Sequence, residues 1–82
     1  MTSYGESLEA ALSIQIKVEL AERGMDQKGL ADAVGINRVT MSHYMTGKRS
    51  MPLPTYFKVA EALGLSAREL MQRTEARIHP EG

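Results

Sequence analysis

The segment 25–49 holds two short helical patterns separated by a single glycine, and this spacing constrains the fold more than any other feature of the chain. Asp26 is a good N-cap for a helix that runs to Val34, and Gly35 lies where a helix must end in the left-handed conformation that glycine adopts without steric cost. Asn37 then caps the next helix. Such a tight turn holds one helix across another at a fixed angle and leaves the outer face of the second helix free.

The other periodic segments also have the helical period, and strand signals are nearly absent. A chain of 82 residues buries too little surface for two cores, so we expect one all-α domain over residues 1–82. The expected helices, followed by a loose tail over 79–82, cover about 6–23, 27–34, 38–46, 54–63 and 67–77.

Apolar stripes and capping residues define the first, fourth and fifth of these helices. The first helix should stop at Gly24 and bury a stripe that recurs every four residues, namely Leu8, Leu12, Ile16 and Leu20. Pro54 suits the first turn of the fourth helix. Its expected buried stripe consists of Phe57, Ala60 and Leu63, with Tyr56 as a further candidate. A capping box over 66–69 opens the fifth helix.

The net charge of the chain is zero, but the charges are distributed unevenly. Residues 27–58 contain five basic side chains and one acidic side chain, whereas the segments on either side carry an excess of acids. A basic centre between acidic ends suits a surface that contacts nucleic acid locally, although an uneven scatter of solvated charges would look the same. No apolar run approaches the roughly 20 residues that span a bilayer, and we expect a soluble protein in the cytoplasm.

Catalytic and metal chemistry find no support in the sequence. Cysteine is absent, which excludes a disulfide framework and a thiolate metal site. His43 and His79 are the only histidines and lack the neighbours of a metal site. Ser42 follows directly before His43, so the two lie about 100° apart on a helix and cannot form a nucleophile–base pair. Glu19 and Glu22 share a helix face and look solvated. We therefore expect no enzyme and no cofactor.

Several short motifs, in this order and at these separations, resemble the lambda-repressor-like helix-turn-helix family of the Cro/CI type over residues 12–72. The motifs are Gln27-x-x-Leu30-Ala31-x-x-x-Gly35-Ile36-Asn37, then Met41, Tyr44 and Gly47-Lys48-Arg49, and finally Val59 to Ser66 with Leu70. The resemblance implies a five-helix domain with its helix-turn-helix at helices 2 and 3. It also implies a sequence-specific regulator of transcription that binds double-stranded DNA.

In such proteins the first two turns of the third helix enter the major groove. The resemblance makes five outward residues candidates for reading bases, namely Arg38, Val39, Thr40, Ser42 and His43. An arginine can place two donors on guanine, and Val39 or the Thr40 methyl group can pack on a thymine methyl. The alternative is a merely solvated helix face, because one arginine and one histidine are a modest charge for a DNA reader.

Phosphate contacts should come from residues at the groove edges, because they fix register and not sequence. Gln27 matches the family position that typically contacts the backbone, and the N-terminal amides of its helix add partial positive charge. The full set of phosphate candidates is Gln27, Lys28, Asn37, Thr46, Lys48 and Arg49.

The sequence departs from the family at two places. Many relatives carry a buried arginine–glutamate pair at the positions of Leu20 and Met45, and here both residues are apolar. Replacing both partners of a buried ion pair by apolar groups is often neutral or stabilising, so we predict that Leu20 and Met45 touch. Gly29 lies where the family usually has a strong helix former, and the sequence offers no reason for it.

The first helix carries a second apolar line, Ala10, Ile14 and Val18, almost opposite its main stripe. Either a second subunit or the C-terminal segment around Arg77 and Ile78 should cover it. Two half-sites one helical turn apart also favour a homodimer, through this line or through the end of the fifth helix. The biological role is left open between a phage Cro-like repressor, a restriction–modification controller and an antitoxin, which would have a protein partner. The rival hypothesis is a protein-interaction module that does not bind DNA.

Overall fold

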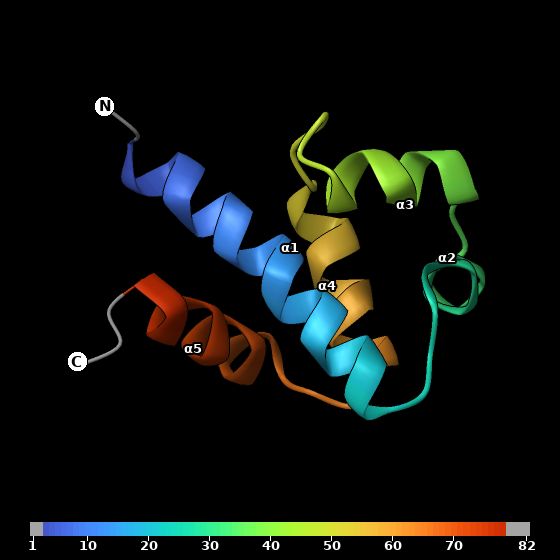
Figure 1. Ribbon diagram of the computed structural model, residues 1–82. Coiled ribbons are helices and arrows are strands. Elements are labelled where there is room, and N and C mark those ends of the chain that lie inside the picture. Colours follow the sequence, from blue (N-terminus) through green and yellow to red (C-terminus); the bar gives the residue numbers. More distant parts are fainter. Residues whose placement is uncertain (1–2, 79–82) are drawn as a thin grey trace.

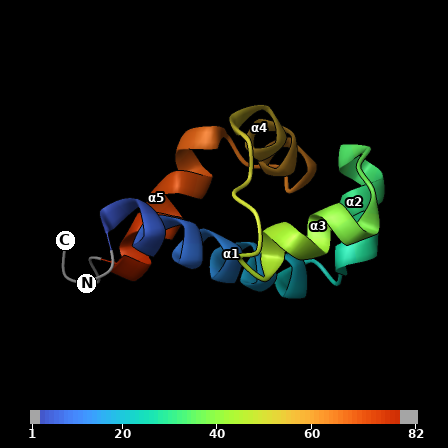
Figure 2. The same cartoon turned by 90° about the horizontal axis from the view of Figure 1, so that it is seen from above.

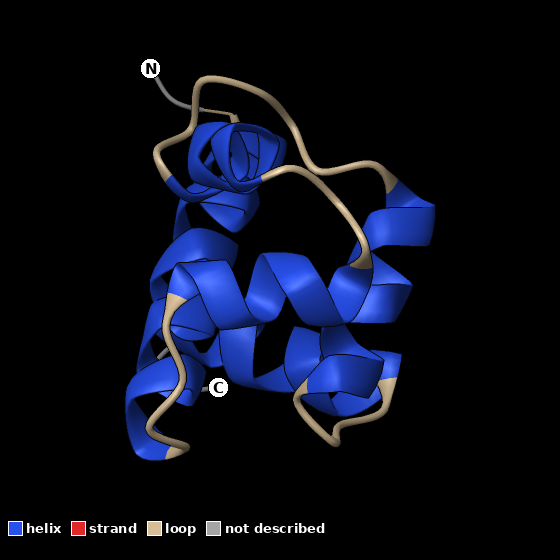
Figure 3. Cartoon of the chain, turned by 90° about the vertical axis from the view of Figure 1, so that its right-hand side faces the viewer, coloured by secondary structure: helices blue, strands red, loops and turns tan. Residues whose placement is uncertain are grey.

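The computed structural model describes residues 3–78, which form five helices and no strand (Figures 1 and 3). The helices are α1 (Tyr4–Glu22), α2 (Gln27–Val34), α3 (Arg38–Met45), α4 (Leu53–Ala62) and α5 (Ala67–Ile78). The all-α prediction is confirmed, and four of the five helices agree with it to within about one residue. α1 starts two residues early because Ser3 caps it, with the Ser3 hydroxyl accepting from the Glu6 N–H at 3.2 Å. The predicted loose tail lies outside the described residues.

The helices enclose one core, with α1 across the front, α4 behind it and α5 beside it (Figure 1). The view from above places α2 and α3 together, on the side of the molecule opposite the start of α1 and the end of α5 (Figure 2). α1 packs mainly on α5 and also on α3, while α2 packs on α3 and α4. α1 and α4 therefore support the α2–α3 pair, and one side of α3 remains exposed.

A single apolar cluster fills the interior and draws on all five helices. Ala31 is fully buried in this cluster, as expected for a small residue where α2 and α3 cross. Leu20 and Met45 are also buried in it, with 4% and 1% of their surfaces exposed. Leu20 and Met45 thus share one apolar interior, and their direct contact stays a prediction.

The prediction that Phe57 belongs to the buried stripe of α4 is wrong. Phe57 is 49% exposed, and the buried residues of α4 are Tyr56, Val59 and Ala60. Val59, Ala60 and Leu63 centre the buried side of α4 close to the direction of Tyr56, and Phe57 points about 100° away from it. Tyr56 takes the inner position, where its hydroxyl is satisfied by donating to the Ala67 carbonyl at the start of α5.

The expectation of a solvated Glu19 is also wrong, because its side chain is 1% exposed. Its carboxylate accepts from Arg73 of α5 at 2.8 and 2.9 Å, and from Arg23 at 2.6 Å. The Gln15 amide donates to it at 2.6 Å, and Arg77 in turn donates to the Gln15 carbonyl oxygen at 2.6 Å. α1 and α5 are therefore joined by a polar seam in which every buried side-chain N or O atom of the described residues has a partner.

This seam gives the stability of the domain a pH dependence. Burial alone would raise the pKa of Glu19, but hydrogen bonds from Arg73, Arg23 and Gln15 outweigh it and hold the pKa below its ordinary value. A carboxyl whose pKa is lowered by folding stabilises the fold above its unfolded pKa of about 4.3 and loses that contribution as the pH falls through the folded value.

We therefore expect the stability gap between the wild type and Glu19→Gln to be widest near pH 7 and to narrow once the pH falls below about 4.3. Urea denaturation of both proteins across this range would measure the gap. The comparison cancels the other carboxyl groups, which both proteins share. A gap that is independent of pH would show that the carboxylate charge contributes nothing.

Candidate nucleic-acid interface

The turn between α2 and α3 has the geometry that its glycine predicts. Gly35 adopts φ = 82°, in the left-handed region, and ends α2. Two residues later the side-chain oxygen of Asn37 accepts from the Val39 N–H at 2.7 Å and caps α3. Met41 and Met45 point inward with 0% and 1% exposure. The remaining side of α3 therefore has a fixed orientation on the surface.

Gly29 has a local explanation at the other end of α2. The Asp26 carboxylate caps this helix by accepting from the Gly29 N–H at 2.7 Å. A Cβ atom at position 29 would lie only 3.3 Å from the same carboxylate oxygen, closer than ordinary van der Waals contact. Glycine therefore leaves the cap undisturbed, which offsets its low helix propensity.

All five candidate base-reading residues keep access to solvent. Arg38 and Val39 are exposed, the latter to 61%, whereas Thr40, Ser42 and His43 are half-buried. The beginnings of α2 and α3 together line a shallow hollow in the surface. It is bordered by Gln27, Lys28, Asn37, Arg38, Val39 and Ser42. The structure thus brings together three base-reading candidates and three phosphate candidates, while Thr40 and His43 lie outside the hollow.

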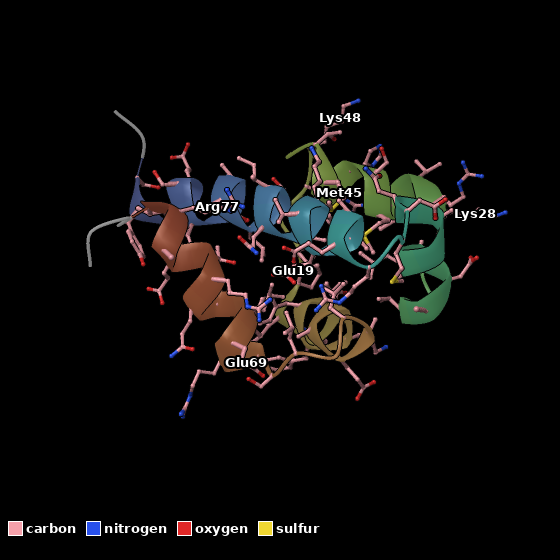
Figure 4. All side chains as sticks on the ribbon, turned by 60° about the horizontal axis from the view of Figure 1, so that its bottom comes forward. Glu19, Lys28, Met45, Lys48, Glu69 and Arg77 are labelled. Atoms are coloured by element: carbon pink, nitrogen blue, oxygen red, sulfur yellow. The ribbon has the colours of Figure 1, made fainter. Side chains whose placement is uncertain are left out.

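The remaining phosphate candidates lie in the turn after α3. The Thr46 hydroxyl donates to the Ser42 carbonyl at 2.8 Å, and the Arg49 N–H donates to the His43 carbonyl at 3.2 Å, so the turn folds back over the end of the helix. Thr46, Lys48 and Arg49 are exposed. Figure 4 shows Lys28 and Lys48 near opposite ends of the α2–α3 unit, both pointing away from the body of the domain. Basic side chains therefore flank α3 on both sides.

Arg49 also borders a second concavity, on the side of α1. This groove of about 270 Å³ has an apolar floor that includes Leu12, Ile16 and Met45, and Glu6 and Glu9 lie on its α1 wall. Arg49 therefore lines the same groove as two acids, whereas Lys48 does not. The two neighbouring cations are not equivalent.

The part of the chain that the structure describes holds neither a metal site nor a membrane-spanning helix. No three histidine, cysteine or acidic residues of this part come close enough to hold a metal ion. None of its helices is long and apolar enough to cross a membrane.

The fold and the exposed third helix define a helix-turn-helix domain. A family model described as "HTH_3: Helix-turn-helix" matches residues 16–70, which is more than half of the chain. The chain belongs to this family, and the resemblance seen in the sequence is confirmed. The expectation of a DNA-binding regulator of transcription is confirmed at the level of this family.

Three solved structures have the same fold. A mutant of the restriction–modification controller protein C.Esp1396I superposes with a TM-score of 0.83 at 21% identity, covering 98% of this chain and all of the controller. The clp gene regulator ClgR from Corynebacterium glutamicum gives 0.81 at 20% identity, over 90% of this chain and 79% of its own. A hypothetical transcription factor, NHTF, from Neisseria gives 0.76 at 24% identity, over 89% of this chain and 84% of its own.

A curated relative matches only locally. The replication factor C small subunit of Thermococcus kodakarensis is 35% identical over 60 residues, which is 73% of this chain. The chain spans just 7% of that protein's length. The match therefore concerns one segment of a much larger protein.

Proposed function

We propose that this protein is a sequence-specific repressor that binds an inverted-repeat operator in double-stranded DNA as a homodimer, in the cytoplasm of a bacterium or of a phage host. The observation that carries the proposal is the exposed outer side of α3, held rigidly by its cap and by Met41 and Met45, with basic side chains at both ends. This is the arrangement that places a recognition helix in a major groove.

We assign base reading to the first two turns of α3. Arg38 is the principal reader, because it is exposed and an arginine can donate twice to guanine. Val39 and Thr40 supply methyl groups for thymine, and Ser42 and His43 follow one turn further along. None of these side chains is needed for the apolar core, which supports their assignment to DNA.

We assign the phosphate contacts to residues on either side of α3. Gln27, Lys28 and Asn37 lie at one edge of the hollow, and the Asn37 amide group is free to donate because only its oxygen serves as the cap. Thr46, Lys48 and Arg49 lie at the other end of the helix. Contacts from both sides would fix the register of α3 in the groove.

Homodimerisation follows from the symmetry of an inverted repeat, because each half-site needs one copy of α3. Two dimer interfaces were expected from the sequence, and one of them, the end of α5, is occupied within the monomer, where Arg77 binds Gln15. Ile14 of the α1 line stays 48% exposed. A restriction–modification controller is among the structural relatives, which favours that role over the phage repressor and over the antitoxin with its protein partner.

Selection of binding sites from a random pool of DNA duplexes at a stated salt concentration tests the proposal. We expect the protein to recover inverted repeats whose half-site centres lie about one helical turn apart. A protein-interaction module on the same scaffold would recover nothing, even at low salt. Its binding to a protein partner through an apolar surface would scarcely respond to salt, whereas DNA binding must weaken steeply.

Lys48→Ala should weaken binding to all duplexes by a similar factor, because a phosphate contact carries no sequence information. It should also reduce the slope of log affinity against log salt by about 1. Titration of one strong and one weak operator at three salt concentrations would measure both effects. Arg68→Ala, on α5 and also exposed, is the matched control and should change neither. Unchanged binding by Lys48→Ala would remove Lys48 from the interface.

A further inference from the structure

α4 presents an exposed apolar pair that the DNA-binding surface does not use. Leu53 is 62% exposed and Phe57 is 49% exposed, and they lie one turn apart on the same side of the helix. Pro52 and Pro54 beside them are exposed as well. We call these four residues the α4 face. Single exposed apolar residues are ordinary on a protein surface, but a contiguous patch that contains an aromatic ring is typical of an interaction site.

The Phe57 ring rests against a buried neighbour. It meets the ring of Tyr56 edge-on, with centroids 5.9 Å apart and an interplanar angle of 61°. Tyr56 is itself buried, and its hydroxyl donates to the Ala67 carbonyl, so this neighbour cannot move freely. An aromatic side chain that is already ordered loses little freedom on binding, which suits an anchor at the centre of an interface.

We infer that the α4 face is the contact through which two copies of this chain pair on DNA, an inference that rests on the proposed function. A two-fold axis makes the contact self-complementary, so Leu53 of one copy packs against Phe57 of the other and the reverse. The two α4 helices then run antiparallel. The turn that carries Lys48 and Arg49 directly precedes α4, so a copy docked on this face lies beside the same stretch of DNA.

Charge at the border of the α4 face also favours a second copy. Lys58 and Glu61 are both exposed there, and their opposite signs leave the border without a net charge that would repel an identical face. In the antiparallel arrangement Glu61 lies beyond Phe57 and reaches the start of the other copy's α4. That helix start has no side-chain cap, and its amides carry partial positive charge that attracts a carboxylate.

The apolar area explains why this pairing depends on DNA. Half of a phenylalanine side chain is about 100 Å², so Leu53 and Phe57 together offer about 200 Å² per copy. A stable dimer buries about 800 Å² per partner. The contact is therefore weak in dilute solution, and it acts when a shared operator holds two copies at high effective concentration.

The test compares a full inverted repeat with a duplex that carries one half-site, both taken from the selected sequences. Wild-type protein should bind the full repeat about 100-fold more tightly than independent half-sites predict. Phe57→Glu and Leu53→Glu should each lose this excess and keep the half-site affinity. Ile14→Glu is the matched control, because Ile14 on α1 is 48% exposed, close to the 49% of Phe57. This variant should keep the excess. Thermal denaturation verifies that all variants are folded.

The possible results separate the two proposals. Full-repeat binding by Phe57→Glu at the wild-type level would overturn the inference, and loss of the excess in Ile14→Glu alone would move the contact to α1. Absence of half-site binding by the wild type would instead contradict the proposed function. Sedimentation equilibrium without DNA, at a protein concentration on the order of 1 mM, gives an independent readout. At this concentration the wild type should associate weakly and Phe57→Glu should remain monomeric. A wild type that stays monomeric in this experiment and shows no excess affinity for the full repeat would also overturn the inference.

Discussion

Replacing Arg23 and Arg73 together by alanine is expected to destabilise the domain more than replacing Glu19 itself. The two guanidinium groups donate three of the four hydrogen bonds that the Glu19 carboxylate accepts from side chains. Without them the carboxylate keeps only the Gln15 amide, in an interior where its side chain is 1% exposed. A buried charge left without its partner costs about 3–5 kcal/mol, which is a large share of the 5–15 kcal/mol that usually stabilises a domain.

Glu19→Leu should cost less, because the arginines it leaves behind can reach water. Their side chains are already 30% and 45% exposed, so their charges need not stay buried. Leucine also fills most of the volume and lacks polar atoms, so we expect a loss of about 1–2 kcal/mol. Urea denaturation at pH 7, followed by circular dichroism, would rank the variants. The opposite ranking would mean that the seam stabilises the fold by packing and not through its charges.

Arg38→Ala is expected to lower affinity for the preferred operator by about 10- to 100-fold, the effect of one bidentate contact to guanine. Affinity for duplexes in which the guanine contacted by Arg38 is replaced should hardly fall. The preference for guanine at that position should therefore disappear. Arg38 is exposed and lies outside the apolar core, so the melting temperature should not change. Competition binding with operators substituted at each position would measure the preference.

Lys28→Ala is the matched control for Arg38→Ala, because Lys28 is exposed and borders the same hollow. It should weaken all duplexes alike, as a phosphate contact does. If Arg38→Ala behaved in the same way, Arg38 would be a phosphate contact and another residue of α3 would read the base.

Local backbone chemistry made most of the fold predictable from the sequence. Gly35 adopts a left-handed conformation and Asn37 caps a helix, and few residue types can fill either role. The structure places both as expected. Met41 and Met45 lie four residues apart, the spacing that puts two side chains on one side of a helix, and both are buried. These signals act within a few residues, so they can be read without knowing the partner helix.

The two wrong predictions concern contacts between distant parts of the chain. Arg73 is 54 residues from Glu19, and nothing near Glu19 indicates that a guanidinium will cover it. Tyr56 and Phe57 are both apolar enough for a core, and only Tyr56 lies on the side of α4 that packs on the other helices, where its hydroxyl reaches the Ala67 carbonyl. Burial of a particular side chain is a property of the packed pair of helices, so periodicity alone cannot assign it.

The candidate DNA-binding site also has a part that follows from local sequence and a part that does not. The exposed side of α3 follows from its cap and its inner residues, so it could be predicted. Which of the outer side chains contacts a base depends on how a duplex docks against the hollow and the turn after α3, and that docking involves atoms outside the chain. The apolar pair on α4 was missed because Phe57 was expected in the core. The available signal was its neighbour Tyr56, which fits an inner position better and finds a polar partner there.

The bond between the Tyr4 hydroxyl and the Glu75 carboxylate, 2.8 Å long, has a practical consequence for engineering. It ties the first turn of α1 to the last turns of α5, so both ends of the described chain emerge together, on the side of the molecule opposite α2 and α3 (Figure 2). A fluorescent reporter fused at either terminus would leave the recognition helix unobstructed. Two copies could also be joined in tandem by a linker that never crosses the DNA face, which would allow one half of an operator to be matched with a mutant subunit and the other with the wild type.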